Sequence, residues 1–407
     1  MTTPPKAATA MRWAAAASCA AEPEDAANEV AESLAATLGE GAADLILFFF
    51  TAPLVPGAEV LASTLKRRLS PGCLAGVSGA SVIGAEHEYE DGPALTAIAA
   101  RLPGVEVKPF VLVPSAWGEA ISDPLEFARH TPGADRAEVV VLFGDPFSLD
   151  AERVLHAFNA NAPGVRLVGG MVSAGPRPYA NALVLNDWVA REGGVGIALK
   201  GALRVDVVVS QGCRPIGPPL RVTRAQRNII LELDGQPALE RAEQVLRELP
   251  EKERKVLRDG LYVGRPARGD ASGRGDYLIR NLLGADRDHG ALAVADLVAE
   301  KEHVRLHVRD AGTALEDLEL LLAPQEFDAH AEGALLFSCN GRGKAFFGRA
   351  DRDIGTLQAA LGGPVPTAGF FCAGEFGPVG EKNFLHGHTT SIAVVRGKAA
   401  GTAGGRA

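Results

Sequence analysis

The sequence lacks several features that mark large classes of protein. It has no run of about 18 or more strongly apolar residues, so we expect no membrane span. Its 41 basic residues are outnumbered by 50 acidic ones, and a broad nucleic-acid surface needs a basic excess, so we expect no nucleic acid as partner. Five cysteines, an odd number in 407 residues, indicate free thiols in a reducing compartment. The composition therefore predicts a cytoplasmic protein.

Chemical signatures are scarce as well. The sequence holds no CxxC or HExxH motif for a metal and no GxSxG motif for a nucleophilic serine. The segment GRGKA (Gly341–Ala345) lacks the spacing and the hydroxyl residue of a phosphate-binding loop. His386 and His388 form an isolated H-x-H pair, which is weak evidence for zinc, and the alternative is a polar loop histidine. We therefore expect neither a metal nor a cofactor.

The chain is instead rich in glycine, with 47 residues, and 47% of it is hydrophobic. This combination argues against a disordered chain and indicates many tight turns around a large core. At roughly 100–200 residues per domain, the length predicts two domains. The alanine-rich segment after Met11 is too weakly apolar for a signal peptide. We expect it to form a strand at Met11–Ser18, with a helix beginning near Glu22.

A strand–helix–strand pattern recurs three times, over residues 44–84, 138–175 and 333–380. Two strands that flank a helix form a parallel pair with a right-handed crossover. We therefore predict an α/β fold of two related domains, with mixed, largely parallel sheets built from βαβ repeats. Further segments are predicted as antiparallel strands, a charged helix and a glycine-rich loop: Leu183–Leu185, Val195–Leu199, Arg204–Ser210, His303–Arg309, Thr389–Val395, Gln236–Gly260 and Gly264–Gly275.

Polar residues collect where the predicted strands end, and ligands in open α/β sheets bind at that edge. Cys339 ends the first strand of the third repeat, and Arg342 follows it closely. The functional interpretation of Cys339 is a ligand-contacting or reactive thiol whose thiolate Arg342 favours; the alternative is a buried structural cysteine. Glu375 lies between glycines, where it would bind a ligand amine or act as a general base. The alternative for Glu375 is to cap backbone amides or to pair with Arg280 or Arg342.

Two further groups extend the candidate site. Arg280 and Asn281 follow an apolar stretch, and a guanidinium suits a carboxylate or a phosphate; the alternative is an internal ion pair with Asp276 or Glu375. Cys213 and Arg214 follow a predicted strand, and the alternative there is a rigid, proline-rich turn. The candidate ligand-binding residues are therefore Ser78, Gly169, Cys213, Arg214, Arg280, Asn281, Cys339, Asn340, Gly341, Arg342, Gly343, Gly374, Glu375 and His386.

Six motifs, in order, resemble those of the FIST family, in which a FIST N domain is followed by a FIST C domain. They are SQGCRPIGPP (Ser210–Pro219), ELDGQPAL (Glu232–Leu239), GDYLIRNLLGAD (Gly275–Asp286), LLFSCNGRG (Leu335–Gly343), GFFCAGEFGPVG (Gly369–Gly380) and NFLHGHTTS (Asn383–Ser391). The resemblance implies a FIST N domain over residues 11–225, a FIST C domain over 226–395 and a disordered tail over 396–407. It also implies a sensory module of signal transduction, for which small ligands such as amino acids have been proposed.

Three hypotheses follow from the residues and the resemblance together. The first is a ligand-binding sensor, in which two α/β domains enclose a pocket for an amino acid or a similar metabolite and act on a signalling protein. The second is a cysteine-dependent enzyme or redox protein that uses Cys339, with His386 as the candidate base. The third is a protein–protein interaction module, with Gly264–Gly275 as its surface. No catalytic residue is assigned, and an enzyme is the less favoured interpretation.

Overall fold

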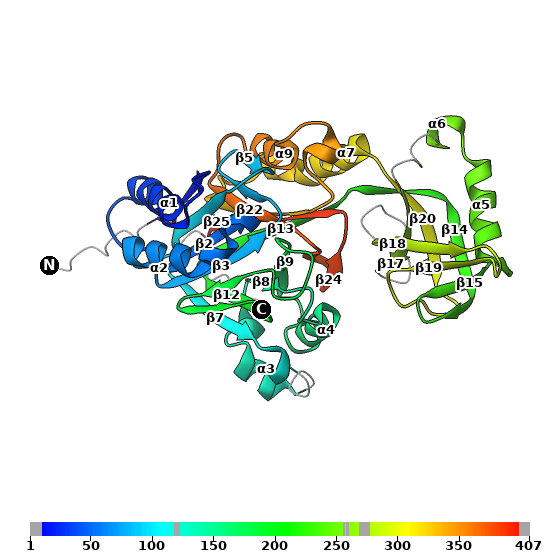
Figure 1. Ribbon diagram of the computed structural model, residues 1–407, viewed down its shortest axis with the longest axis horizontal. Helices are drawn as coiled ribbons and strands as arrows, with labels where there is room; N and C mark the ends of the chain where they lie inside the picture. The colour runs from blue at the N-terminus through cyan, green and yellow to red at the C-terminus, as the bar shows by residue number, and fades with distance from the viewer. Residues whose placement is uncertain (1–9, 118–122, 255–256, 258–259, 268–276, 399–407) are drawn as a thin grey trace, which may run out of the picture. The chain divides into compact units, whose positions relative to one another are not determined.

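The computed structural model describes residues 10–117, 123–254, 257, 260–267 and 277–398. The chain forms two compact units (Figure 1). Unit 1 comprises the chain up to Val209 together with Leu322–Leu385 and the segment from Thr390 onward, and unit 2 comprises Ser210–Leu321 and His386–Thr389. Among the described helices, none has the length and apolar character needed to cross a membrane.

Unit 1 is built on three six-stranded sheets. In sheet order, the first holds β1 (Arg12–Ser18), β6 (Leu95–Arg101), β2 (Leu45–Thr51), β3 (Cys73–Gly79), β10 (Leu183–Leu185) and β11 (Trp188–Ala190). The second holds β24 (Lys382–His386), β23 (Glu375–Val379), β9 (Arg166–Met171), β8 (Val139–Gly144), β12 (Gly194–Gly201) and β7 (Val105–Leu112). The third holds β13 (Leu203–Gln211), β25 (Thr389–Gly397), β21 (Gly333–Cys339), β22 (Thr367–Cys372), β4 (Val82–Gly84) and β5 (His87–Tyr89).

Each of the three sequence repeats forms a parallel strand pair with a helix between its strands. The repeats are β2–α2 (Ala58–Leu69)–β3, β8–α4 (Ala151–Asn161)–β9 and β21–α9 (Arg352–Ala360)–β22. Their neighbours in the sheets run the other way, as in the antiparallel pairs β2–β6, β8–β12 and β21–β25. The α/β class is therefore confirmed, but the described sheets are mixed and not largely parallel. All three repeats lie in unit 1, so they do not relate one unit to the other.

The continuous apolar runs of these strands arise because both faces of the sheets are covered. On β2, Leu45, Leu47 and Phe49 face a core shared by all three sheets, whereas the alternate residues face α1 (Pro23–Leu38) and α2. In the same way, α4 packs on the outer face of β8 with α3 (Pro124–His130) beside it. Unit 1 thus has an inner core between sheets and outer cores beneath helices.

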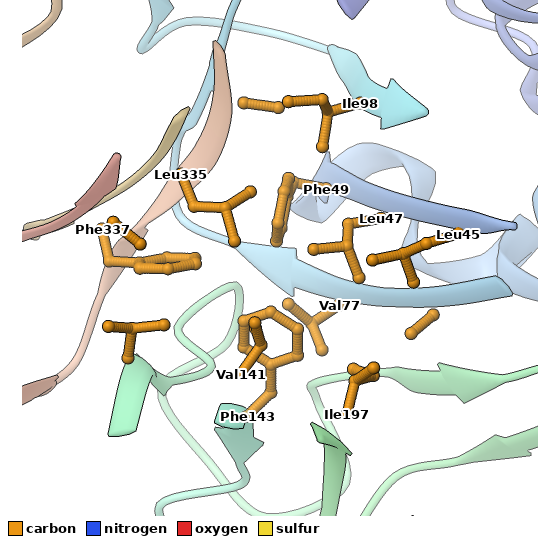
Figure 2. Close-up of a cluster of buried hydrophobic side chains, with 14 of the residues drawn as sticks. Leu45, Leu47, Phe49, Val77, Ile98, Val141, Phe143, Ile197, Leu335 and Phe337 are labelled. Atoms are coloured by element: carbon orange, nitrogen blue, oxygen red, sulfur yellow. The ribbon is translucent and has the colours of Figure 1, made fainter. Parts of the chain in front are cut away.

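Three phenylalanines meet at the middle of the inner core, and each comes from the first strand of a different repeat. Phe49, Phe143 and Phe337 lie with ring centroids 5.8 Å (Phe49–Phe143), 6.2 Å (Phe49–Phe337) and 5.8 Å (Phe143–Phe337) apart. Their register partners on the second strands are Val77, Gly170 and Phe370. Figure 2 shows the three labelled rings converging from their separate strands. The three repeats therefore surround one aromatic centre in a pseudo-three-fold manner.

Unit 2 contains a closed barrel of six antiparallel strands. In order around the barrel they are β14 (Cys213–Gln226), β20 (His303–Arg309), β17 (Leu261–Pro266), β18 (Tyr277–Asp286), β19 (Ala291–Val294) and β15 (Ile229–Leu233), and β15 pairs again with β14. The short β16 (Gln236–Pro237) extends β15, and α5 (Ala238–Glu248) packs on the barrel core. Two further helices of the chain are α6 (Glu251–Arg254) and α8 (Lys344–Phe347). The long α7 (Ala311–Leu322) follows β20.

The five predicted antiparallel strands are confirmed as β10, β12, β13, β20 and β25, and the charged helix as α5 and α6. Two of the predicted segments differ from the structure. The first residues of the predicted glycine-rich loop, Gly264–Pro266, belong to β17, and residues 268–276 lie outside the described residues. The proline-rich turn is a strand, β14, whose register with β20 shifts between Ile216 and Leu220, where Pro218 and Pro219 lie. Proline has no backbone N–H group to donate, and residues in a bulge need not donate to the neighbouring strand, so a bulge tolerates proline.

The first two residues of the predicted tail belong to a strand. β25 continues to Gly397, and Arg396 is 2% exposed. Its guanidinium donates hydrogen bonds to the Asp206 carboxylate at 2.8 Å and to the Ala329 carbonyl at 2.6 Å. Residues 399–407 lie outside the described residues. The domain boundary predicted between residues 225 and 226 falls one residue before β14 ends and remains a prediction about the family domains.

Candidate functional site

A buried ion pair lies directly after β21, where the sequence predicted a site. Arg342 donates from Nε and Nη2 to the two carboxylate oxygens of Asp353, at 2.7 Å each. The hydroxyl of Ser338 donates to the same carboxylate at 2.5 Å. The side chains of Arg342 and Asp353 are 0% and 1% exposed. The bidentate geometry fixes the guanidinium plane, so the first role of Arg342 is structural.

Two thiols and a second carboxylate surround this pair; we call Cys339, Arg342, Asp353, Cys372 and Glu375 the strand-end cluster. Burial lowers the pKa of Arg342, but the charges of Asp353, Cys339 and Glu375 outweigh it, so that the pKa is raised. Burial raises the pKa of Cys372, and the charges of Glu375 and Cys339 add to the shift. Electrostatic coupling thus links Arg342 with Cys339 and Glu375, and Cys339 and Cys372 are register partners on neighbouring strands. Glu375 is 0% exposed and opens β23.

One N–H group of the strand-end cluster is left unused. The Nη1 atom of Arg342 is buried and has no hydrogen-bond partner among the described residues. A buried donor without a partner costs on the order of 1–3 kcal/mol, and native proteins keep such groups rarely and for a reason. The cluster therefore combines a guanidinium donor that has no hydrogen-bond acceptor with a buried carboxylate, a pair that is complementary to a zwitterion. No group of three or more metal-binding side chains occurs in the described part of the chain.

Sequence reasoning missed the carboxylates that hold this site together. Glu88, on β5, accepts hydrogen bonds from the backbone amides of Asp351, Asp353 and Ile354 at 3.0–3.2 Å. It therefore caps the start of α9, the helix that carries Asp353. Asp351 returns the contact by accepting from the amide of Glu88 at 2.6 Å. The acidic start of α9 was visible in the sequence, but its partner lies 263 positions away, and no local pattern reveals such a partner.

Glu88 predicts a dependence of stability on pH. Burial raises the pKa of Glu88 from 4.5 to about 7, and the charge of Asp353 adds to the shift while the amides of Ile354 and Asp353 oppose it. Because the folded state then binds a proton more tightly than the unfolded state, stability is highest below pH 4.5 and falls as the pH rises through 7. We expect this residue to make the protein about 2–3 kcal/mol less stable at pH 8 than at pH 5.

Urea denaturation of wild type and Glu88→Gln at both pH values checks this expectation. The variant cannot titrate at position 88, so its pH dependence is expected to be smaller by that amount. Nearby titratable groups, namely His87, Glu90, Asp351 and Asp353, are present in both proteins and cancel in the comparison. An equal pH dependence in the two proteins would show that Glu88 stays ionised throughout.

The predicted glycine and serine contacts in unit 1 have packing roles. Gly169 has a φ of +122°, and a Cβ there would lie 2.1 Å from the carbonyl oxygen of Leu142. A Cβ on Gly343 would lie 2.5 Å from the carboxylate of Glu90. The hydroxyl of Ser78 accepts from the amide of Ala182 at 2.9 Å, and the carbonyl of Gly374 accepts from the amide of Met171 at 2.8 Å. Whether a ligand also contacts these residues stays a prediction.

Asn340 and Gly341 complete the loop after β21. Both are exposed, and the amide of Asn340 donates to the carbonyl of Cys372 at 2.9 Å. This hydrogen bond ties the loop to the end of the neighbouring strand, so the exposed side chain of Asn340 stands next to the buried cluster. Cys339 itself is half-buried. These residues remain the candidate contacts on the accessible side of the strand-end cluster.

The remaining candidates lie in unit 2 or at its chain boundaries, and most are on strands instead of loops. Arg280 and Asn281 belong to β18. Arg280 pairs with Asp296 at 2.8 Å, and Asp276, one of the partners predicted for it, lies outside the described residues. Asn281 contacts the His388 ring at 2.7 Å. Arg214 pairs with Asp310 at 3.2 Å. Cys213 is 3% exposed and packs with Tyr277 and Ile279. His386 is 2% exposed at the end of β24.

Comparison with known proteins shows which family the chain resembles over most of its length. A family model described as FIST N domain matches residues 44–236, and one described as FIST C domain matches residues 238–378. An uncharacterized protein of Mycobacterium bovis is 36% identical over 383 residues, covering 91% of this chain and 94% of that protein. An uncharacterized protein of Mycobacterium tuberculosis is 35% identical over 388 residues, covering 94% of this chain and 99% of that protein.

Among solved structures, a cyanuric acid hydrolase from A. caulinodans aligns over 96% of this chain and 100% of its own. Its sequence is 11% identical and its TM-score is 0.34, a likeness too slight to support a functional argument. The two family models match in the order that the six sequence motifs imply. The chain therefore belongs to the FIST family, with a FIST N domain followed by a FIST C domain.

Proposed function

We propose that this FIST protein is a cytoplasmic sensor that binds a small zwitterion, such as an amino acid, at the strand-end cluster and passes the signal to a partner protein. FIST domains are associated with sensing in signal transduction. The observation that supports a zwitterion is the unused Nη1 donor of Arg342 beside the buried carboxylate of Glu375. The guanidinium would donate to the ligand's carboxylate, and Glu375 would accept from its ammonium group.

Charge balance within the cluster favours the same ligand. Asp353 already neutralises Arg342 through two hydrogen bonds, and Glu375 adds a second buried carboxylate to the cluster. A purely anionic ligand would add to that negative charge, whereas a ligand that brings an ammonium group compensates it. Glycines on either side of Glu375 leave room for a ligand close to the backbone. We therefore expect α-amino acids to bind better than the corresponding carboxylic acids.

Isothermal titration calorimetry with the twenty amino acids, and with the carboxylic acids that lack their amino group, tests this proposal. We expect saturable binding of at least one amino acid and about 10–100-fold weaker binding of its amino-free analogue, since a charged hydrogen bond contributes about 1.5–3 kcal/mol. Glu375→Gln should cause a similar loss, and Glu381→Gln, at an exposed position, should cause none. Failure of every amino acid to bind a well-folded sample would refute the proposal.

A redox or cysteine-dependent role is the second candidate, and one observation favours it. Cys339 and Cys372 are register partners on the parallel strands β21 and β22, and neither is in a disulfide. Register partners present their side chains on the same face of a sheet, so the two thiols are neighbours, one half-buried and one buried. No observation favours the interaction-module hypothesis, because most of its predicted surface lies outside the described residues.

A further inference from the structure

An unusual histidine lies on the outer face of the unit 2 barrel. Val304, Leu306 and Val308 of β20 belong to the barrel core, so the alternate residues of this strand, including His307, point outward. His307 is nevertheless 0% exposed. Its ring lies over Gly264, where a Cβ would come within 2.2 Å of Cε1. The glycine in β17 therefore makes room for the imidazole at this position.

The hydrogen bonding of His307 leaves one ring nitrogen without a partner. Nδ1 lies 3.0 Å from the carbonyl oxygen of Arg305, which accepts a hydrogen bond only if Nδ1 carries the proton. Nε2 is then a bare acceptor, and it is buried with no hydrogen-bond partner among the described residues. Burial lowers the pKa of His307 to about 4, so the ring stays neutral at physiological pH. The His307 ring is therefore held in one tautomer and in its neutral form, with Nε2 as the acceptor.

Aromatic side chains of the same unit surround this acceptor. The Tyr277 ring lies 5.1 Å from the His307 ring, and Tyr262 is the register partner of His307 on β17. Tyr262 in turn lies 4.5 Å from the His388 ring. Cys213 and Ile279 pack with the two tyrosines. The acceptor therefore lies in buried, mostly apolar surroundings, and small-molecule sites combine such a lining with a few precisely placed polar atoms.

Charge narrows the class of ligand. Arg305 and Arg309 lie two residues before and after His307 on the same outward face of β20. Two guanidinium groups on this face disfavour a cationic donor such as an ammonium group. We propose that the outer face of the unit 2 barrel carries a ligand site in which Nε2 of His307 accepts a hydrogen bond from an uncharged ring compound with an N–H or O–H group. This site involves residues of unit 2 alone and does not depend on the zwitterion proposed for unit 1.

Phenol and anisole form a matched pair of probes, because they share a ring and differ in the O–H donor. Both are titrated into the full chain labelled with ¹⁵N-histidine, and the Nε2 resonance of His307 is identified by its loss in His307→Phe. We expect phenol to shift this resonance saturably, and anisole to bind at least about ten-fold more weakly. His307→Phe should weaken phenol binding by a similar factor without lowering the melting temperature, since it removes a buried acceptor that has no partner.

Several outcomes would overturn the site. Equal affinity for phenol and anisole, or no binding of either, would show that Nε2 does not recognise a donor. An Nε2 resonance already at the hydrogen-bonded position in the free protein, together with a lower melting temperature for His307→Phe, would show an acceptor satisfied by structural water. If His307→Phe fails to fold, the comparison of phenol with anisole in the wild-type protein still tests whether the site recognises a hydrogen-bond donor. Glu375→Gln should leave phenol binding unchanged whether or not unit 1 binds amino acids.

Discussion

Replacing Asp353 with asparagine is expected to lower the free energy of unfolding by about 3–5 kcal/mol, because it leaves the guanidinium of Arg342 buried without a counter-charge. The side chain of Arg342 is 0% exposed, and it donates both of its strong hydrogen bonds to Asp353. The amide of asparagine offers one oxygen and no charge in place of two charged oxygens. The hydroxyl of Ser338 loses its charged acceptor as well. Urea denaturation measures the change.

A control variant and a double variant test whether the loss of stability arises from leaving a charge buried without its partner. Asp187 also pairs with a cation, Lys66, at 2.6 Å, but its side chain is 81% exposed. Asp187→Asn is therefore expected to cost less than about 1 kcal/mol. The double variant Arg342→Met with Asp353→Leu removes both charges, and it should recover most of the loss, since apolar residues of similar volume replace buried ion pairs well. A similar cost for Asp353→Asn and Asp187→Asn would contradict the account.

The elements of unit 1 were predictable where the signal is local. The three repeats showed continuous apolar strands because both faces of the sheets are buried, and the positions of Phe49, Phe143 and Phe337 follow from those strands. The site residues after β21 were also predictable, because strand ends collect polar groups. The antiparallel neighbours of each repeat were not, since strand order depends on pairings between segments far apart in the chain.

The partners of the site residues were the least predictable part. Arg342 was proposed as a ligand contact, and nothing near it in the sequence identifies Asp353 as its ion-pair partner. His307 lies in a strand, HVRLHVR, whose alternation places His303, Arg305, His307 and Arg309 on one face. Such a face is ordinarily solvated, so a buried neutral histidine could not be inferred. Burial of polar groups depends on tertiary packing, which local patterns do not encode.

The second large effect is expected at the aromatic centre of unit 1. Phe337→Ala should lower the free energy of unfolding by about 3–5 kcal/mol, because it removes a ring from a closely packed core and leaves a cavity. Phe337 is 0% exposed, and its ring lies 5.8 Å from both Phe143 and Phe370 and 6.2 Å from Phe49. Because each neighbour belongs to a different strand, no single side chain can move inward to fill the space. Trp13 packs in the same core, so its fluorescence reports the urea transition.

Two comparisons test whether the three repeats share this centre. Phe327→Ala is the matched control, because Phe327 is 89% exposed and its loss should change stability by less than about 0.5 kcal/mol. Phe49→Ala and Phe143→Ala should each cost about as much as Phe337→Ala, since the three rings occupy equivalent places. Pairs of these substitutions should be non-additive by about 0.5–3 kcal/mol, because the cavities merge. Additive losses would mean that the repeats pack as independent layers, and the pseudo-three-fold centre would then describe the geometry of unit 1 but not its cooperative stability.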